Sequence, residues 1–177
     1  MINHEYKVLF IHVIKTGGTS IATALNMDRK QYHIPATTVR KLVGEGIWAD
    51  YFKFAFVRNP YEKIVSQYHY NRGKFGFKDS TFEEYIKAWS KGAKISTHPQ
   101  SHLSYINEKL DFIGRFETLQ QDYNTICDKI EIPRQQLPHK NKSKHKCHTE
   151  YYDDETRQIV AEKYAKDIEY FGYKFGE

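Results

Sequence analysis

A run of lysine, hydroxyl and glycine residues near the start of the chain has the composition of an anion-binding loop. The run is Lys15-Thr-Gly-Gly-Thr-Ser20, and it follows an apolar segment of strand type, Val8–Val13. A turn at the start of a helix presents backbone N–H groups, its glycines let the backbone approach a ligand closely, and the helix dipole favours negative charge. Lys15 adds a mobile cation and the three hydroxyls add donors. The loop therefore predicts a site for a phosphate or sulfate group.

A second anion-binding pattern follows a later apolar strand, Phe52–Val57. The sequence there is Arg58-Asn-Pro-Tyr-Glu-Lys-Ile-Val-Ser66, and Pro60 stands at the first turn of an expected helix, Tyr61–Tyr70. Arg58 leaves the strand at its carboxyl end, and Ser66 lies about two turns into the helix. A guanidinium and a hydroxyl that converge on one place suit a terminal phosphate monoester.

The elements that must position these two patterns alternate between strand and helix, which is typical of an α/β fold with a mainly parallel sheet. The carboxyl ends of parallel strands meet at one edge of a sheet, and ligands of open α/β sheets bind at that edge. We therefore expect the two patterns to grip one ligand that has two separated anionic groups.

The remaining elements complete a single domain over residues 1–177, with a central, mainly parallel sheet flanked by helices. Strands are expected at Lys7–Val13, Gln31–Ile34, Phe52–Val57 and Phe112–Arg115. Besides the helix after Arg58, helices are expected at Gly18–Met27, from a cap at Thr37 or Thr38 through Val43, from a capping box at Thr81 to Trp89, at Glu117–Ile130 and at Asp153–Glu169.

Composition narrows the class of protein. The chain has 177 residues, 40% of them hydrophobic and 28% charged, as in a globular domain of ordinary size. It has no apolar run of about 18 residues that could span a membrane, and its first strand leaves no room for a signal peptide. Cys127 and Cys147 are far apart and form no redox motif, so we expect a cytoplasmic location.

The net charge of +5 favours an anionic partner. Much of the positive charge lies in one basic segment, Pro133–Thr149, which either binds donor or acceptor or is a solvated loop; the sequence leaves both open. Nucleic acid is not expected as the partner, because no recognition helix is evident. The spacing of His145, Cys147 and His148 fits no standard zinc template, so no metal site is expected.

The order of residues in the first loop disfavours an ordinary P-loop NTPase. That motif has its lysine after the glycines, followed by a hydroxyl residue that holds magnesium. Here Lys15 precedes Gly17 and Gly18. The way of binding an anion is shared, but the motif is not.

Both patterns resemble motifs of the PAPS-dependent carbohydrate sulfotransferase family, in its sulfotransferase family 2-like, bacterial form. Lys15–Ser20 resembles the family's 5′-phosphosulfate loop, and Arg58–Ser66 resembles its 3′-phosphate motif. The later segments Phe112-Ile-Gly-Arg-Phe-Glu117 and Tyr170-Phe-Gly-Tyr-Lys-Phe175 also resemble its bacterial members. The resemblance implies a P-loop-like sulfotransferase fold and transfer of a sulfuryl group from 3′-phosphoadenosine 5′-phosphosulfate (PAPS), which leaves as PAP, to an acceptor hydroxyl or amine.

The resemblance also implies roles for individual residues. Lys15 would contact the phosphosulfate and stabilise the leaving oxygen, and Arg58 and Ser66 would bind the 3′-phosphate. The 5′-phosphate would be cradled by the rest of the loop, Thr16, Gly17, Gly18, Thr19 and Ser20. No metal is required by this scheme. Ile14 departs from the family, which often has a proline there to pre-set the turn.

A general base must take the acceptor's proton, and relatives commonly have a catalytic histidine in the interval where His33 lies. Imidazole titrates near the working pH of most enzymes, so His33 is the preferred candidate. His12 is expected to be structural, with a role in orienting the loop as an alternative. Other candidates for the base are His98, His102, Glu62 and Glu117.

Two other functions remain open: a catalytically silent module that binds PAP or PAPS, and a small-molecule kinase, for which no magnesium ligands can be assigned. Carbohydrate is the preferred acceptor class, with a lipid or a small metabolite as alternatives. The sequence does not determine the acceptor, the position that is sulfated or the oligomeric state.

Overall fold

The computed structural model describes residues 1–177 except 29–32, 73–76, 97–100 and 139–145. The chain forms two compact units, each assembled from two stretches of sequence. The first unit comprises Met1–Arg58 and His102–Lys142, and the second comprises Asn59–Ser101 and Ser143–Glu177. That residues 1–177 act as one sulfotransferase domain stays a prediction.

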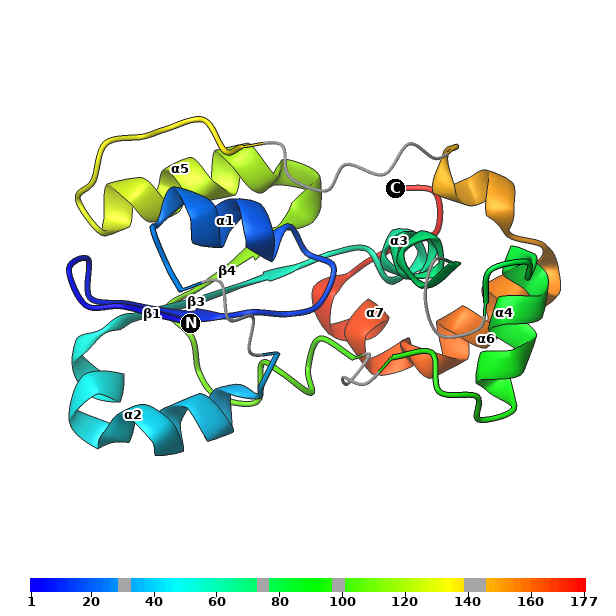
Figure 1. Ribbon diagram of the computed structural model, residues 1–177, viewed down its shortest axis with the longest axis horizontal. Helices are drawn as coiled ribbons and strands as arrows, with labels where there is room; N and C mark the ends of the chain where they lie inside the picture. The colour runs from blue at the N-terminus through cyan, green and yellow to red at the C-terminus, as the bar shows by residue number, and fades with distance from the viewer. Residues whose placement is uncertain (29–32, 73–76, 97–100, 139–145) are drawn as a thin grey trace. The chain divides into compact units, whose positions relative to one another are not determined.

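The first unit is built on a four-stranded sheet with the strand order β1-β2-β3-β4 (Figure 1). The strands are β1 (Ile2–Asn3), β2 (Val8–Ile11), β3 (Phe52–Val57) and β4 (Phe112–Arg115). β1 runs antiparallel to β2, whereas β2, β3 and β4 are parallel to one another. The expected α/β fold with a mainly parallel sheet is confirmed, and its three parallel strands end at the same edge. The short β1 was not expected.

Helices cover both faces of this sheet. Helices α1 (Gly18–Ala24) and α5 (Leu119–Lys129) lie on one face, and α2 (Ala36–Asp50) lies on the other (Figure 1). A short 3₁₀ turn, η1 (Phe116–Thr118), connects β4 to α5. Side chains of a strand point alternately to the two faces of its sheet. Because helices cover both faces here, every residue of β2 is buried, either under α1 and α5 or under α2.

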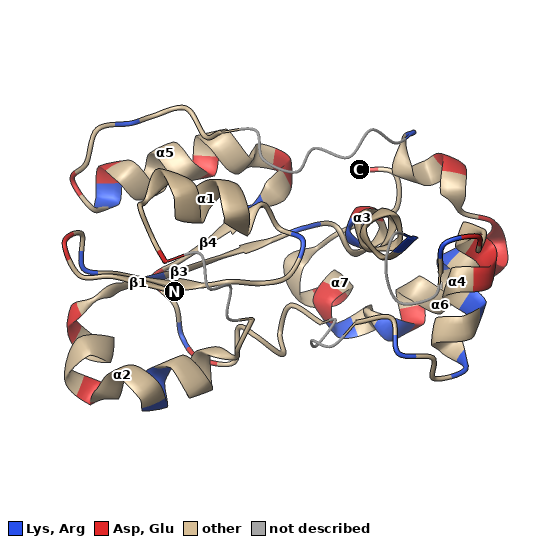
Figure 2. Cartoon of the chain, viewed as in Figure 1, with Lys and Arg blue, Asp and Glu red and all other residues tan. Residues whose placement is uncertain are grey.

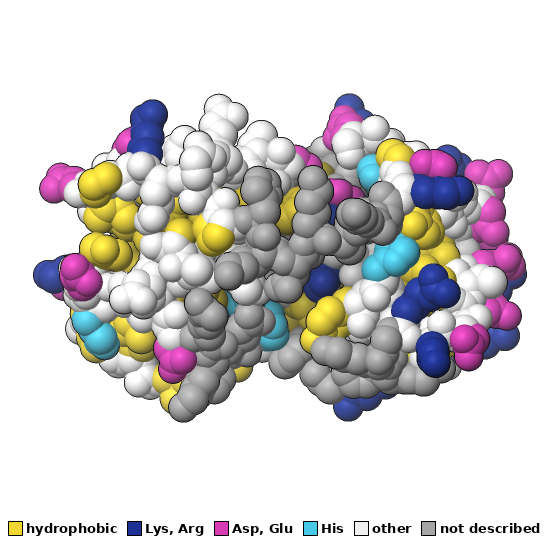
Figure 3. Space-filling model, turned by 45° about the horizontal axis from the view of Figure 1, so that its top comes forward, with side chains coloured by type: hydrophobic (Ala, Val, Ile, Leu, Met, Phe, Trp, Pro, Cys, Tyr) yellow, Lys and Arg dark blue, Asp and Glu magenta, His cyan; other side chains and the backbone are white. Residues whose placement is uncertain are grey.

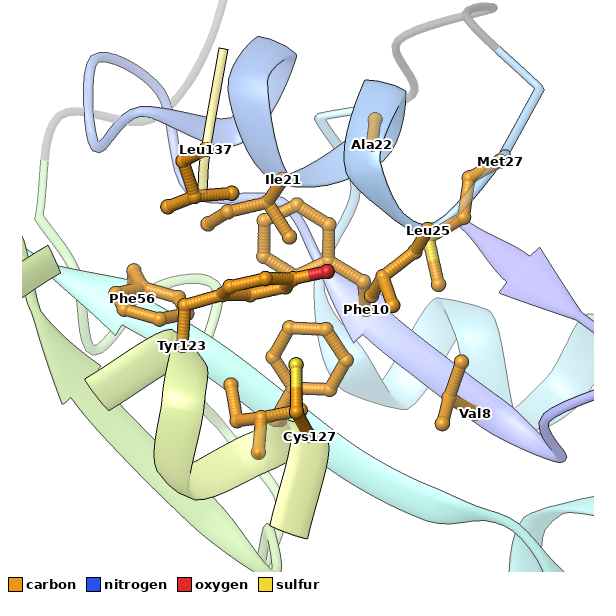
Figure 4. Close-up of a cluster of buried hydrophobic side chains, with 12 residues drawn as sticks. Val8, Phe10, Ile21, Ala22, Leu25, Met27, Phe56, Tyr123, Cys127 and Leu137 are labelled. Carbon is orange, nitrogen blue, oxygen red and sulfur yellow. The ribbon is translucent and has the colours of Figure 1, made fainter. Parts of the chain in front are cut away.

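Aromatic rings fill the core between the sheet and the helices α1 and α5 (Figure 4). Phe10 and Phe54 stack with their ring centroids 4.8 Å apart, and they share a buried cluster with Ile21 of α1 and with Leu25, which caps the end of α1. Full burial of a side chain of this size stabilises a fold by roughly 1.5–3 kcal/mol. This core therefore anchors α1 firmly, and with it the loop between β2 and α1.

The other face buries a lysine as well as apolar side chains. Lys53 on β3 is 9% exposed, and its ammonium donates to the backbone carbonyls of Trp48 and Tyr51, at 3.1 and 2.6 Å. It also lies 2.9 Å from a carboxylate oxygen of Asp111. A buried charge is tolerated only when it is paired in this way.

Two expected elements of the first unit differ clearly from the structure. The helix expected to end at Val43 continues as α2 to Asp50, but Gly44 interrupts it with a left-handed φ of 81°. Its N-cap is Pro35 rather than a threonine, with no side-chain cap bond. The expected strand Gln31–Ile34 lies partly outside the described residues, and Ile34 belongs to no strand.

The second unit is helical in its described part. Its helices are α3 (Pro60–Arg72), α4 (Phe82–Ser90), α6 (Asp154–Lys163) and α7 (Ala165–Phe171), with a 3₁₀ turn η2 (His148–Tyr151). The predicted helix Asp153–Glu169 is thus two helices, which meet at the buried Tyr164. No helix in the described part of the chain has the length and apolarity that crossing a bilayer demands.

The start of α4 agrees with its sequence signature. The Thr81 hydroxyl accepts from the Glu84 N–H at 3.2 Å, and the Glu84 carboxylate accepts from the Thr81 N–H at 2.8 Å, as in a capping box. Asp153 and Thr156 form a similar box at the start of α6. Figure 2 shows acidic residues gathered where these two helices begin, which is the end that a helix dipole favours for negative charge.

Candidate functional site

The loop after β2 has an unusual backbone. Lys15 and Gly17 both have left-handed φ angles, 63° and 80°. Glycine adopts this conformation freely, whereas it costs another residue about 1–2 kcal/mol. Such turns direct successive N–H groups into one concavity, which is a common way to bind an anion. The loop therefore holds a lysine in a strained conformation at the place where the sequence predicts an anion.

The threonine hydroxyl next to Lys15 closes the loop instead of facing a ligand. Thr16 is fully buried, and its hydroxyl donates to the Val13 carbonyl at 2.9 Å. Its expected part in the cradle therefore reduces to its backbone. At the other end of the loop, the Ser20 N–H donates to the Gly17 carbonyl at 3.0 Å. Because α1 has only seven residues, its dipole adds less than the sequence suggested.

His12 occupies the space in front of Gly18. A Cβ atom added to Gly18 would lie 1.9 Å from Nε2 of His12, so no residue larger than glycine fits there without displacing the imidazole. His12 is 4% exposed and follows β2 directly, rather than lying within the strand as expected. This contact agrees with a structural role for His12 that supports the start of α1.

His33 lies against His12. Its Nδ1 atom is 3.1 Å from the His12 backbone carbonyl oxygen, and the two ring centroids are 4.3 Å apart. A carbonyl can only accept, so we assign the hydrogen to Nδ1 of His33, which leaves the lone pair on Nε2. His33 is half-buried. A neutral imidazole of either tautomer has one nitrogen that can accept a proton, and in His33 this is Nε2.

Arg58 follows β3, and within the first unit it contacts the loop after β2. Its Nη1 atom donates to the Lys15 backbone carbonyl at 3.2 Å, and its guanidinium carbon lies 3.9 Å from the centroid of the Phe116 ring. Only 5% of Arg58 is exposed. The structure therefore brings Lys15 and Arg58 together at the carboxyl edge of two adjacent parallel strands, as the sequence predicts.

Behind Arg58, His102 supports the end of β3. The Arg58 backbone N–H donates to Nε2 of His102 at 3.3 Å, and His102 is fully buried. The lone pair of this imidazole is therefore already engaged. This bond counts against His102 as the base, and His33 keeps that role as a prediction.

The other predicted site residues lie elsewhere in the described chain or outside it, except Glu117, which follows Phe116 in η1. Ser66 lies on α3 of the second unit, is 6% exposed, and keeps its role at the 3′-phosphate as a prediction. Glu62 also lies on α3, and Glu117 is exposed on η1. His98 lies outside the described residues, as does part of the basic segment Pro133–Thr149.

Sequence reasoning missed two contacts of Arg58. The ring of Phe116 and the imidazole of His102 both come from segments far along the chain, where no local pattern points to Arg58. For Phe116 a signal existed: it follows the expected strand Phe112–Arg115, whose carboxyl end belongs to the same sheet edge. No such signal existed for His102, which precedes β4 in an irregular segment.

The profile of the sulfotransferase family matches residues 1–174, which include both anion-binding patterns. The chain belongs to the sulfotransferase family. This sulfotransferase is similar to an uncharacterized protein of Archaeoglobus fulgidus, with 34% identity over 104 residues that cover 58% of this chain and 86% of that protein. No solved structure matches the chain.

In the described part of this sulfotransferase, no three histidine, cysteine or acidic side chains are grouped so that they could hold a metal ion. Of the three residues considered for zinc, His145 lies outside the described residues. Cys147 is exposed and His148 is buried in η2.

Proposed function

We propose that this sulfotransferase takes its sulfuryl group from PAPS and transfers it to an acceptor hydroxyl or amine. The observation that supports this most is the hydrogen bond from Arg58 Nη1 to the Lys15 carbonyl, 3.2 Å long. It joins the two patterns expected at opposite ends of one donor, a 5′-phosphosulfate and a 3′-phosphate. Carbohydrate is the acceptor class that we propose first, before a lipid or a small metabolite.

The residues of the first unit fit this donor. Lys15 and Arg58 supply two cations, and Arg58 offers a planar set of N–H groups suited to a phosphate. A Cβ atom at Gly17 would lie 2.9 Å from Leu119, and one at Gly18 would strike His12, so the backbone at both positions must stay bare. Backbone N–H groups at Thr16, Gly17, Gly18 and Thr19 complete the proposed cradle, and Ser20, whose N–H is bonded to the Gly17 carbonyl, would contribute through its hydroxyl.

Different residues of the chain would then assist different steps of the transfer. PAPS, when bound, supplies a sulfuryl group attached to a phosphate leaving group. The acceptor oxygen or nitrogen forms a bond to sulfur as the bond from sulfur to the 5′-phosphate oxygen breaks. The Lys15 ammonium stabilises the charge that develops on that oxygen. Nε2 of His33 takes the acceptor's proton, and its Nδ1–H bond to the His12 carbonyl stabilises the imidazolium that results.

A transfer assay with ³⁵S-labelled PAPS and a panel of glycans, lipids and small metabolites tests the proposal. We expect label in a product and release of PAP. Lys15→Ala should abolish turnover, and Arg58→Ala should mainly weaken PAP binding. His33→Ala should lower the transfer rate by about 10²–10⁴-fold with PAP affinity retained.

Thermal shift with PAP, PAPS and ATP provides the second measurement. We expect stabilisation by PAP and PAPS and much less by ATP. Stabilisation by PAP without transfer to any acceptor would indicate a silent binding module instead. Stabilisation by ATP and magnesium alone would indicate a kinase and overturn the proposal.

A cytoplasmic location and the absence of a nucleic-acid partner belong to the same proposal. The two cysteines are free, which suits a reducing compartment. Among the described side chains on the face shown in Figure 3, lysine and arginine stand among acidic ones. A nucleic acid would favour a continuous stripe of positive charge.

A further inference from the structure

The ring of Phe116 lies directly against the charged head of Arg58. The guanidinium carbon is 3.9 Å from the ring centroid, too close for an approach from the ring edge, so Arg58 lies over the ring face. A cation over an aromatic face is attracted by the ring quadrupole. The contact uses the π face of Phe116 and leaves the N–H groups of Arg58 for hydrogen bonds.

The same ring also borders the loop after β2. A Cβ atom added to Gly17 would lie 3.4 Å from Cδ2 of Phe116, so the ring lies close to that backbone. Phe116 itself belongs to η1, directly after β4. One aromatic side chain thus lies beside both the arginine and the glycine loop.

We propose that Phe116 is a positioning residue, which holds the Arg58 guanidinium so that its N–H groups face the donor's 3′-phosphate. This inference rests on the proposed function. Arginine has several rotatable bonds, and an unsupported head would lose conformational freedom each time it bound the phosphate. Arg58 is held from two sides before any ligand arrives: by the Phe116 ring and by the bond from Nη1 to the Lys15 carbonyl.

A comparison of two ligands tests this role, because PAP has a 3′-phosphate and adenosine 5′-monophosphate lacks it. Isothermal titration calorimetry of Phe116→Leu should show PAP binding weakened about 2- to 30-fold, which corresponds to ~0.5–2 kcal/mol. The affinity for adenosine 5′-monophosphate should stay within about twofold of the wild type. Phe116→Tyr keeps the aromatic face and should restore PAP binding.

Phe112→Leu is the matched control, since Phe112 lies on β4 and packs against the core. It should leave the ratio of the two affinities unchanged. If Phe116→Leu weakens both ligands equally, or neither, the positioning role is wrong. If the wild type does not prefer PAP over adenosine 5′-monophosphate, the proposed donor is wrong as well.

A double variant guards against a general loss of folding. In an Arg58→Ala background, Phe116→Leu should change PAP affinity no further, because the group that it positions is gone. A further loss of PAP affinity in that background would show that Phe116 acts in some other way, and would overturn the inference.

Discussion

At the scale of single residues, Lys15 joins a functional side chain to a strained backbone. Its φ of 63° is one that glycine adopts at no cost. We predict that Lys15→Ala and Lys15→Gly both abolish turnover, but that the glycine variant is the more stable by about 1 kcal/mol. Urea unfolding measures this difference.

Lys7 supplies the control for that comparison, because it also has a left-handed φ, 50°, and is exposed. Lys7→Gly should exceed Lys7→Ala in stability by a similar amount while both keep their activity. Equal stability of the two Lys15 variants would show that the loop stores no strain there.

His102 allows a second prediction at this scale. His102→Leu removes the acceptor of the buried Arg58 N–H and should lower the free energy of unfolding by about 1–3 kcal/mol. His102→Gln keeps an acceptor and should lose less. A larger loss for glutamine than for leucine would contradict the role of the Nε2 atom in holding β3.

Residue types and spacing were sufficient to predict that Lys15 and Arg58 meet, because each follows a strand at the same sheet edge. They were not sufficient to predict how Arg58 is held. Its contacts with Phe116 and His102 join segments far apart in sequence and depend on tertiary packing. The place of Phe116 after an expected strand gave a signal for the first contact, and no local pattern gave one for the second.

At the scale of elements, the start of α1 depends on the fit between Gly18 and His12. We predict that Gly18→Ala lowers the free energy of unfolding by about 1–3 kcal/mol, since the added methyl group must displace the imidazole. Thermal or urea unfolding measures the loss. The reason is packing and not backbone conformation, because Gly18 has no left-handed φ.

A second substitution tests that reason. His12→Ser makes room beside Gly18, so the double variant should lose less stability than the sum of the two single changes. Strict additivity would mean that the two residues do not interact. Gly46→Ala in α2, where an added Cβ meets no atom within 4 Å, is the control without a clash and should raise stability by about 0.5–1 kcal/mol.

Local signals also explain which elements could be predicted. The apolar run of β3, Pro60 at the start of α3 and the capping box before α4 each specify their element within a few residues. The break at Tyr164 could not be read in this way, because Ile159, Val160 and Ile168 keep helical spacing across it. Tyr164 is 1% exposed, and packing within the second unit sets its conformation.

At the scale of the whole molecule, the reactivity of each cysteine measures how accessible one part of the chain is. Cys127 is fully buried in the core of the first unit, and burial raises the pKa of its thiol. Cys147 is exposed in the second unit, and a hydrogen bond from the Thr149 hydroxyl lowers the pKa of its thiol. Because the thiolate is the reactive form, we predict fast labelling of Cys147 and very slow labelling of Cys127 by a thiol reagent.

PAP should slow the labelling of Cys127 further. PAP at a concentration of about 100 times its dissociation constant stabilises the folded protein by about 2.7 kcal/mol. Because Cys127 can react only when the fold opens, its labelling should slow by up to about 100-fold. Cys147 should label at an unchanged rate and is the internal control. If PAP binds but does not slow Cys127, its site lies outside the first unit.

The outer strands of the sheet have a consequence for handling the protein at high concentration. Among the described residues, the sheet is bordered by β1, which has two residues, and by β4, which has four and includes Gly114. Long edge strands expose backbone N–H and C=O groups that can pair with a strand of another molecule and so cause aggregation, whereas short edge strands expose few such groups. Concentrated solutions of the folded chain should therefore stay free of amyloid-type assembly.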